Sequence, residues 1–301
     1  MQRILVTGAN GLLGQKLVAQ LLQRPGIDPI FTAKSDLVLS PSRGEFYRLD
    51  ITNRDEVLAV VQRAKPDVII NTAAMTNVDQ CEVEQEACIE VNVNAVSHLV
   101  EACQLHGIHL VQVSTDFIFD GTEGPLDENA TPNPVNFYGE SKLQAERLIL
   151  DSAIAWTVLR TVLVYGVTQD MSRSNIVLWA RKILMEGKPI RVVNDQWRTP
   201  TLAEDLALGC YLTATKKAKG VFNISGNEML TPYDIAIKTA EVFKLNKSLI
   251  TPTDSTAFKQ RAARPLKTGF KIDKAQRELG YAPHSFQGGL ELVQEQLSNL
   301  Q

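Results

Sequence analysis

Apolar residues recur along this chain in two patterns that alternate. Short apolar runs, typical of β-strands, lie at residues 4–7, 29–32, 46–49, 67–71, 109–114 and 157–164. Between them, apolar residues recur at helical spacing over residues 12–22, 55–64, 84–106 and 136–151. Strands that alternate with helices predict an α/β fold, in which a doubly wound parallel sheet of the Rossmann type is covered by helices on both faces.

The alternation becomes less regular after Gly166. The pattern there predicts a strand at residues 190–193, a loop that contains Pro200, and helices at residues 176–186, 231–243 and 273–279. A chain of 301 residues is long for one core, because single cores stop growing near ~250–300 residues. We therefore expect a Rossmann domain over residues 1–165. Residues 166–301 are expected to form most of a smaller C-terminal substrate-binding lobe and to return some segments to the sheet.

The first predicted strand runs directly into a glycine-rich turn, GANGLLG at residues 8–14. A glycine motif between a strand and a helix is typical of a dinucleotide site, because glycine permits a tight turn and a close approach of the backbone to the pyrophosphate. The pyrophosphate then binds at the helix N-terminus. The spacing is GxxGxxG rather than the basic GxGxxG, which indicates one subgroup of these proteins. The turn residues expected to bind the cofactor are Gly8, Asn10, Gly11, Leu12, Leu13 and Gly14.

Residues that follow the second and third predicted strands indicate where the adenine end would lie. Lys34 and Ser35 suit the 2′-phosphate of NADPH, whereas Asp36 suits the ribose of NADH, so the sequence favours NADPH and leaves NADH open. Lys34 is equally consistent with a solvated loop charge. Asp50 and Ile51 lie where an acid can meet the adenine amino group, although Asp50 is equally suited to cap the next helix.

A tyrosine and a lysine four residues apart, Tyr138 and Lys142, fall on one face of the predicted helix at residues 136–151. A nearby ammonium and a cationic nicotinamide are expected to lower the pKa of the phenol, so that Tyr138 donates a proton while Lys142 holds the nicotinamide ribose. Thr115 ends the preceding strand at the carboxyl edge of the sheet, where it can bind a carbonyl oxygen. A Tyr–Lys pair alone is a weak signal, but its position after the glycine turn favours a catalytic set of Thr115, Tyr138 and Lys142.

Charge and composition limit the classes of partner that the sequence favours. Lys and Arg total 31 and Asp and Glu total 34, so a formal charge of −3 gives no global attraction to nucleic acid or an anionic membrane. The four cysteines form no CxxC pair and the four histidines do not cluster with them, so we expect buried or idle thiols and no metal site. The N-terminal apolar run is too short for a signal peptide. We expect a cytoplasmic protein with a small-molecule substrate, and consider a homodimer.

At the glycine turn and around Thr115, Tyr138 and Lys142, the chain resembles the extended short-chain dehydrogenase/reductases, and within them the dTDP-4-dehydrorhamnose reductase branch. The motifs that carry the resemblance are the glycine turn, NTAAMTNVD at residues 71–79, STDFIFDG at 114–121, PVNFYGESK at 134–142, NDQWRTPT at 194–201 and RP at 264–265. The resemblance implies reduction of the C4 ketone of a dTDP-linked 4-keto-6-deoxy sugar by NADPH or NADH. It further implies a cofactor lined by Ala73, Ala74 and Thr76, and a substrate that meets Asp116, Phe117, Gln196, Arg198 and Arg264.

Two departures from the family pattern leave the identity of the substrate open. Leu163 stands where the family usually has a Trp near the sugar nucleotide, and Arg198 stands where it has a small glycine. Arg198, Arg261 and Arg264 suit a nucleotide diphosphate, but each is at least equally suited to an ion pair. Trp197 can stack on a base or sugar ring, although a core or interface position is commoner for Trp.

Two other functions remain open. One is a non-catalytic, NADP-binding regulatory subunit, because the β subunit of methionine adenosyltransferase resembles the same family. The intact Thr115, Tyr138 and Lys142 favour an enzyme over such a subunit. The other is an epimerase or dehydratase, which ranks lowest because Phe117 and Ile118 stand where a dehydratase would offer an acid pair.

Overall fold

Seven parallel strands form the central sheet of the structure, a computed structural model that describes residues 1–171, 174–258 and 260–300. The spatial order of the strands is β10 (Gly220–Asn223), β6 (Trp156–Thr161), β5 (His109–Thr115), β4 (Val68–Asn71), β1 (Gln2–Thr7), β2 (Ile27–Ala33) and β3 (Glu45–Arg48). Apolar side chains on both faces of the inner strands are buried, as the continuous apolar runs predict. The predicted Rossmann sheet is confirmed.

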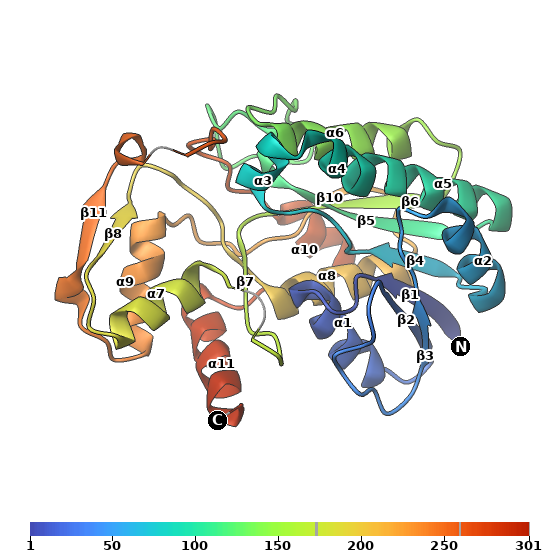
Figure 1. Ribbon diagram of the computed structural model, residues 1–301, viewed down its shortest axis with the longest axis horizontal. Helices are drawn as coiled ribbons and strands as arrows, with labels where there is room; N and C mark the ends of the chain where they lie inside the picture. The colour runs from blue at the N-terminus through green and yellow to red at the C-terminus, as the bar shows by residue number, and fades with distance from the viewer. Residues whose placement is uncertain (172–173, 259, 301) are drawn as a thin grey trace.

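Helices cover both faces of this sheet (Figure 1). One face packs against α1 (Leu12–Leu22), α8 (Ala203–Lys216) and α10 (Asp273–Leu279), in a core that includes Leu17, Leu206 and Leu279. The other face packs against α2 (Arg54–Ala64), α5 (Ala95–His106) and α6 (Phe137–Leu150), in a core that includes Val57, Leu99 and Ile149. The sheet is therefore doubly wound.

The strand order reverses between β1 and β4, which both pair with parallel neighbours. The chain winds outward from β1 through β2 to β3, then crosses back to β4 and winds outward through β5 to β6. Ligands of doubly wound sheets bind outside the carboxyl ends of the strands at such a reversal. The ends of β1, β4 and β5 therefore define where the candidate site is to be sought.

The chain after residue 166 forms a separate group of elements beside the sheet and also returns to it (Figure 1). The group contains α7 (Ile176–Met185), α9 (Pro232–Val242), α11 (Phe286–Asn299) and a parallel pair of strands, β8 (Ile190–Val193) and β11 (Ile250–Thr253). Single 3₁₀ turns lie at Lys247–Leu249 and Ser255–Ala257. The returning elements are β10, which pairs with β6, and α8 and α10, which pack on the sheet.

Two predicted elements differ from the structure. The helix predicted over residues 84–106 is divided into α4 (Gln85–Ile89), a π-helical turn (Glu90–Asn94) and α5, and is preceded by α3 (Val78–Val83). The strand predicted over residues 157–164 ends at Thr161, because Leu163 has a left-handed backbone with φ of 40°. Beyond it, the short strand β7 (Val164–Tyr165) pairs with β9 (Thr201–Leu202).

Candidate active site

The glycine turn lies at the carboxyl end of β1 and opens helix α1. Gly8 has φ of 66°, a conformation that favours glycine, and a Cβ on Gly14 would lie 2.2 Å from the Gly8 carbonyl oxygen. The third glycine therefore brings α1 directly against the turn. A Cβ on Gly11 would meet only the Gly8 carbonyl oxygen, at 3.3 Å, so the backbone at Gly11 is open on its outer side.

The N-terminus of α1 fits a bound pyrophosphate. Its N-cap residue is Gly11, and no side chain caps the first turn, which begins with Leu12 and Leu13 and contains Gly14. Uncapped amide groups and the positive end of the helix dipole favour an anion at this position. The open face of Gly11 lets that anion approach the backbone, so the residues present fit a dinucleotide.

The residues predicted for the adenine end lie together around the ends of β2 and β3. Lys34 Nζ lies 2.7 Å from Asp50 Oδ2, and Arg48 pairs with Asp36 at 2.6 Å. The Asn10 side chain donates to the Ser35 hydroxyl at 3.1 Å and to the Asp36 carbonyl at 2.9 Å. Arg48 was not among the sequence predictions, although its place at the end of the third strand is a signal that points to it.

Asp50 does not cap helix α2, whose N-cap is Asn53. Partial burial raises the pKa of the Asp50 carboxyl, but hydrogen bonds from Lys34 and Thr52 outweigh that effect and hold the pKa below its usual value. The next residue, Ile51, is 7% exposed and packs in the sheet core. Asp50 is thus available as a charged acceptor beside Lys34.

The loop after β4, with Ala73, Ala74 and Thr76, is held by a buried asparagine that the sequence analysis missed. Asn92, in the π-helical turn, accepts a hydrogen bond from the Met75 amide at 2.9 Å and donates to the Met75 carbonyl at 3.0 Å. It also donates to the Ser141 hydroxyl at 3.0 Å. The loop and helix α6 are therefore fixed by the same side chain.

Helix α6 presents Tyr138 and Lys142 on its buried face, toward the end of β5. Asn136 caps the helix by accepting from the Gly139 amide at 2.8 Å, and Lys142 Nζ donates to the Val113 carbonyl at 2.8 Å. A Cβ on Gly139 would lie 2.1 Å from the Phe117 carbonyl oxygen, so glycine permits the close contact between this helix and the β5 end. The structure therefore brings the predicted catalytic helix and strand together.

Tyr138 is 8% exposed, and its phenol lies beside the Thr115 side chain. Burial raises the pKa of the phenol, and Asp116, Cys81 and Cys88 raise it further. The net direction is upward, so the expected lowering of this pKa does not hold for the protein itself. The phenol is protonated across the neutral range.

The pKa of Lys142 is shifted downward, whereas a role as a fixed cation would favour an upward shift. Burial lowers the pKa of its ammonium to about 8, while the carboxylate of Glu146 raises it. Glu146 also forms a buried ion pair with Arg160 of β6, at 2.8 Å. Lys142 is therefore a cation at neutral pH and loses its charge as the pH rises through about 8.

Asp116 and Phe117 form a 3₁₀ turn (Asp116–Ile118) directly after Thr115. Asp116 is 2% exposed, and its carboxylate accepts hydrogen bonds from the hydroxyls of Thr268 and Thr115. Arg198 Nε lies 3.5 Å from the same carboxylate. The Phe117 ring meets the Tyr138 ring edge to face, with centroids 5.8 Å apart.

The two arginines predicted to meet a substrate make contacts within the protein. Arg264 forms a forked pair with Asp79, with both distances near 2.8 and 2.7 Å. Together with a hydrogen bond from the Ala262 amide, this pair holds the pKa of Asp79 at about 2. Gln196 is buried, and Trp197 is 40% exposed rather than a core residue. Arg261 is exposed.

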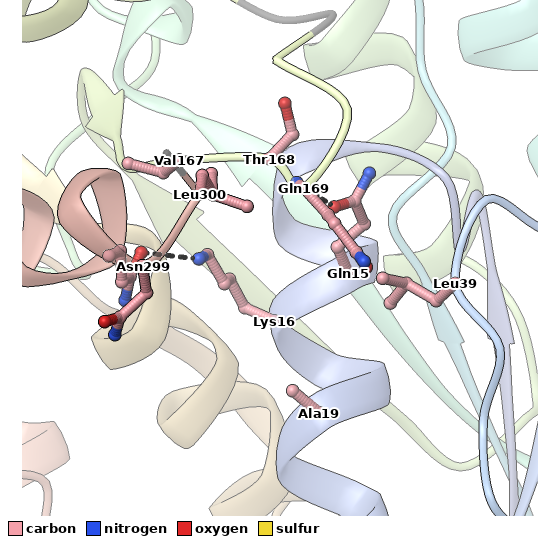
Figure 2. A pocket seen from close by; sticks show the side chains of 10 residues that line it. Gln15, Lys16, Ala19, Leu39, Val167, Thr168, Gln169, Asn299 and Leu300 are labelled. Carbon is pink, nitrogen blue, oxygen red and sulfur yellow. Dashed lines mark hydrogen bonds between the residues drawn. The ribbon is translucent and has the colours of Figure 1, made fainter.

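A cavity of about 230 Å³ lies beside α1, away from these residues (Figure 2). It is lined by α1, the loop at Val167 to Gln169 and the end of α11, and none of the predicted site residues lines it. Figure 2 shows the Gln15 side chain between α1 and this loop, where Gln15 Oε1 accepts from the Gln169 amide at 2.8 Å and Nε2 donates to the Asn10 carbonyl at 3.2 Å. Gln15 therefore connects the glycine turn to the chain after residue 166.

Three further observations concern metals, thiols and membranes. Within the residues that the structure describes, no group of three or more His, Cys, Asp or Glu side chains is placed to hold a metal ion. The four cysteines are free and buried. None of the helices in the described part of the chain has the length and apolar character needed to cross a membrane.

Fold and site together define a Rossmann protein of the extended short-chain dehydrogenase/reductase type, with its glycine turn, Thr115, Tyr138 and Lys142 at one edge of a parallel sheet. The family model described as the RmlD substrate binding domain matches residues 1–299, and the chain belongs to that family.

Its relatives in this family carry two different names. The methionine adenosyltransferase 2 subunit beta of Xenopus laevis is 34% identical over 260 residues, which cover 83% of this chain and 75% of the relative. A dTDP-4-dehydrorhamnose reductase of Aggregatibacter actinomycetemcomitans is 32% identical over 305 residues, which cover 97% and 98%. The crystal structure of a dTDP-4-dehydrorhamnose reductase from Bacillus anthracis in complex with NADP is 29% identical, with a TM-score of 0.84 and coverage of 98% and 100%.

Proposed function

We propose that this protein is an NAD(P)H-dependent reductase of a nucleotide-linked 4-keto-6-deoxy sugar. The observation that carries the proposal is the placement of Tyr138 beside Thr115, with Lys142 one helical turn away, at the carboxyl edge of the sheet. This set stands at the same edge as the uncapped glycine turn, which fits a dinucleotide. The named reductases among the relatives supply the proposed substrate class.

Each side chain has a role that follows from its surroundings. The nicotinamide, when bound, supplies a hydride to the ketone carbon. Tyr138 donates its proton to the developing alkoxide, and its raised pKa keeps that proton in place until the reaction. Thr115 orients the phenol and the carbonyl oxygen, and cationic Lys142 holds the nicotinamide ribose.

The preferred cofactor is NADPH. Two cations, Lys34 and Arg48, stand at the adenine end. Lys34 pairs with the partly buried Asp50, and Arg48 pairs with the exposed Asp36. A 2′-phosphate placed between them would gain two charge-assisted hydrogen bonds, which the 2′-hydroxyl of NADH cannot make with the same strength. Asp50 and Ile51 would lie against the adenine.

The substrate would bind between the sheet edge and the lobe that we assign to residues 166–301. Asp116, Phe117 and Gln196 are the proposed substrate-facing residues. Arg198 and Arg264 already contact protein carbonyls and carboxylates, so we propose that they shape this site rather than grip a diphosphate. Leu163, in place of the family Trp, would widen the site near the nucleotide.

A second candidate function is that of an NADP-binding regulatory subunit. The similarity to the β subunit of methionine adenosyltransferase 2 favours it, and so does the covering of Tyr138, which leaves the phenol 8% exposed. In that case the dinucleotide would be bound without turnover.

The decisive experiment follows loss of reduced-nicotinamide absorbance with NADPH and then NADH, against a panel of 4-keto-6-deoxy nucleotide sugars. Turnover is expected for the wild type, and Tyr138→Phe is expected to lose at least ~10²-fold while binding NADPH unchanged. Saturable cofactor binding with flat traces throughout would replace the reductase with the regulatory subunit. Retained turnover in Tyr138→Phe would remove the phenol from the mechanism.

A further inference from the structure

Arg198 joins two parts of the molecule that are far apart in the sequence. Its Nη1 donates to the Trp197 carbonyl at 2.8 Å and to the Leu266 carbonyl at 3.2 Å, and its Nη2 donates to the Pro265 carbonyl at 2.5 Å. On its other side, Nε faces the Asp116 carboxylate at the end of β5. The side chain is 5% exposed, so its donors are directed at protein acceptors.

The carboxylate that Arg198 faces controls the hydrogen bonds of Thr115. Thr115 Oγ1 donates to Asp116 Oδ1 at 3.3 Å and accepts from the Phe117 amide at 3.2 Å. A hydroxyl has one proton, so a Thr115 that donates to Asp116 has only lone pairs left to offer the neighbouring Tyr138 phenol. The charged state of Asp116 thereby fixes where the phenolic proton points before a ketone arrives.

A second route from Arg198 to the phenol runs through packing. The Arg198 guanidinium lies over the Phe117 ring, 5.9 Å from its centroid, and the same ring meets Tyr138 edge to face. A polar route through Asp116 to Thr115, which lies beside Tyr138, and a ring contact through Phe117 therefore both start from the same arginine. Sequence patterns gave no sign of either route.

The arginine is itself held by residues 261–268, which we call the covering segment. This segment is tied to the sheet side at three further points: the Asn136 side chain donates to the Ala263 carbonyl at 2.8 Å, Asp79 pairs with Arg264 at 2.7 Å, and the Thr268 hydroxyl donates to Asp116. The covering segment thus fixes the position of the Arg198 side chain, and Arg198 in turn contacts Asp116 at the end of β5.

We propose that Arg198 is a positioning residue that sets the geometry of Thr115 and Tyr138 through Asp116 and Phe117, and that it makes this geometry depend on the covering segment. The proposal rests on the proposed reductase function. The proposal gives a role to Arg198, which stands where the family pattern has a small glycine.

The charge of Arg198 and its shape have separable effects. Burial raises the pKa of Asp116 and the guanidinium lowers it. The charged or titratable groups that bear on this pair are Tyr138, which faces Asp116, and Arg264, which faces Arg198. Loss of the guanidinium therefore raises the pKa of Asp116 further, and a protonated Asp116 can donate to Thr115 instead of accepting from it.

The test compares Arg198→Met, Arg198→Lys and a control, Arg277→Met, whose arginine is two-thirds exposed on α10. Arg198→Met is expected to lower kcat by ~10- to 100-fold with the KM for NADPH unchanged, the scale of a misplaced catalytic group. The acid limb of its pH–rate profile is expected to move to higher pH. Arg198→Lys keeps the positive charge but loses the forked guanidinium geometry. Its acid limb is therefore expected to return to the wild-type pH, while its kcat stays low.

A second readout does not require turnover. Amide hydrogen exchange at Phe117, whose N–H is bonded to Thr115, is expected to accelerate in Arg198→Met and less in Arg198→Lys, relative to Arg277→Met. If the wild type turns over but both Arg198 variants match the control in kcat and acid limb, the proposal is overturned while the reductase stands. If the wild type shows no turnover, the reductase fails and exchange alone decides: unchanged protection at Phe117 overturns the positioning role.

Discussion

Burial shifts the pKa values of the two proposed catalytic side chains on α6, Tyr138 and Lys142, in opposite directions. Tyr138 keeps its proton because burial raises its pKa, and Lys142 approaches neutrality because burial lowers its pKa to about 8. Both shifts follow from the cost of a charge in a poorly solvated site. The pair is thus suited to proton donation at neutral pH and would lose its cation in mild alkali.

This gives a pH prediction for the proposed reductase activity. Lys142 is cationic below about pH 8 and neutral above it, so reductive kcat/KM is expected to fall as the pH rises through about 8. Tyr138 cannot produce this limb, because its pKa is raised and not lowered. In Lys142→Arg, which stays cationic, the limb is expected to disappear even if the rate is lower. The same limb in both proteins would assign it to another group.

Single residues are also expected to set the proposed preference for NADPH over NADH. Lys34→Gln and Arg48→Gln are each expected to raise the Kd for NADPH by ~10-fold or more, the scale of a lost charged hydrogen bond, and to leave the Kd for NADH nearly unchanged. Lys188→Gln, an exposed lysine far along the chain, is the matched control. Calorimetric titration with both cofactors makes the comparison. An equal loss for NADH would show that these cations do not meet the 2′-phosphate.

How much of the site was predictable differs from residue to residue. The placement of Thr115, Tyr138 and Lys142 at one edge of the sheet was predictable from the sequence, because a strand end and a four-residue helical spacing are local features. The contacts of Arg198 with Asp116 and Pro265 depend on the fold of three segments, and no local pattern carries them. Asn92 could not be predicted, because it lies in a stretch whose pattern indicates one uninterrupted helix. The π-helical turn, which the pattern does not show, directs its side chain toward Met75.

At the scale of elements, the strands were predicted better than the late helices. Buried parallel strands have continuous apolar runs, which are visible without a partner. Helix α8 has buried residues around most of its circumference, including Asp205 and Thr213, so it lacks the apolar stripe that marks a surface helix. Helix α11 has two glycines in its first turn, and β10, with the sequence GVFN, has only two apolar residues between a glycine and an asparagine. These three elements were therefore missed, although chain segments were expected to return to the sheet.

The contact between α1 and the glycine turn gives a prediction at this scale. In Gly14→Ala the new Cβ would lie 2.2 Å from a backbone oxygen, so α1 must shift away from the turn. We expect a loss of ~1–3 kcal/mol in the free energy of unfolding, as for overpacked cores, and weaker dinucleotide binding. Gly288→Ala in the first turn of α11 is the control, because its nearest contact is a serine hydroxyl at 3.2 Å. Urea unfolding and NADPH titration compare the two; an unshifted Kd in Gly14→Ala would contradict the expectation.

At the scale of the whole molecule, the returning chain is joined to the sheet beside a buried histidine. Thr157 on β6 donates its single hydroxyl proton to the Ala218 carbonyl, so it must accept from His109 Nε2, which lies 2.8 Å away on β5. The proton of neutral His109 is therefore on Nε2. Nδ1 is buried and has no hydrogen-bond partner among the described residues. A second proton would have to be placed on that nitrogen.

Acid should therefore destabilise the fold through His109. Burial, together with the charges of Lys217 and Lys219, lowers the pKa of this imidazole to about 4, whereas the unfolded chain takes up the proton near pH ~6.5. Between these values the unfolded state binds more protons, so the free energy of unfolding is expected to fall as the pH falls from ~6.5 to about 4. In His109→Gln the dependence of the free energy of unfolding on pH is expected to weaken by the equivalent of up to one bound proton. His106 is an exposed histidine at the end of α5, and in His106→Gln this dependence is expected to stay as in the wild type. Urea unfolding at a series of pH values measures the slopes; identical slopes in all three proteins would mean that another group drives the acid loss.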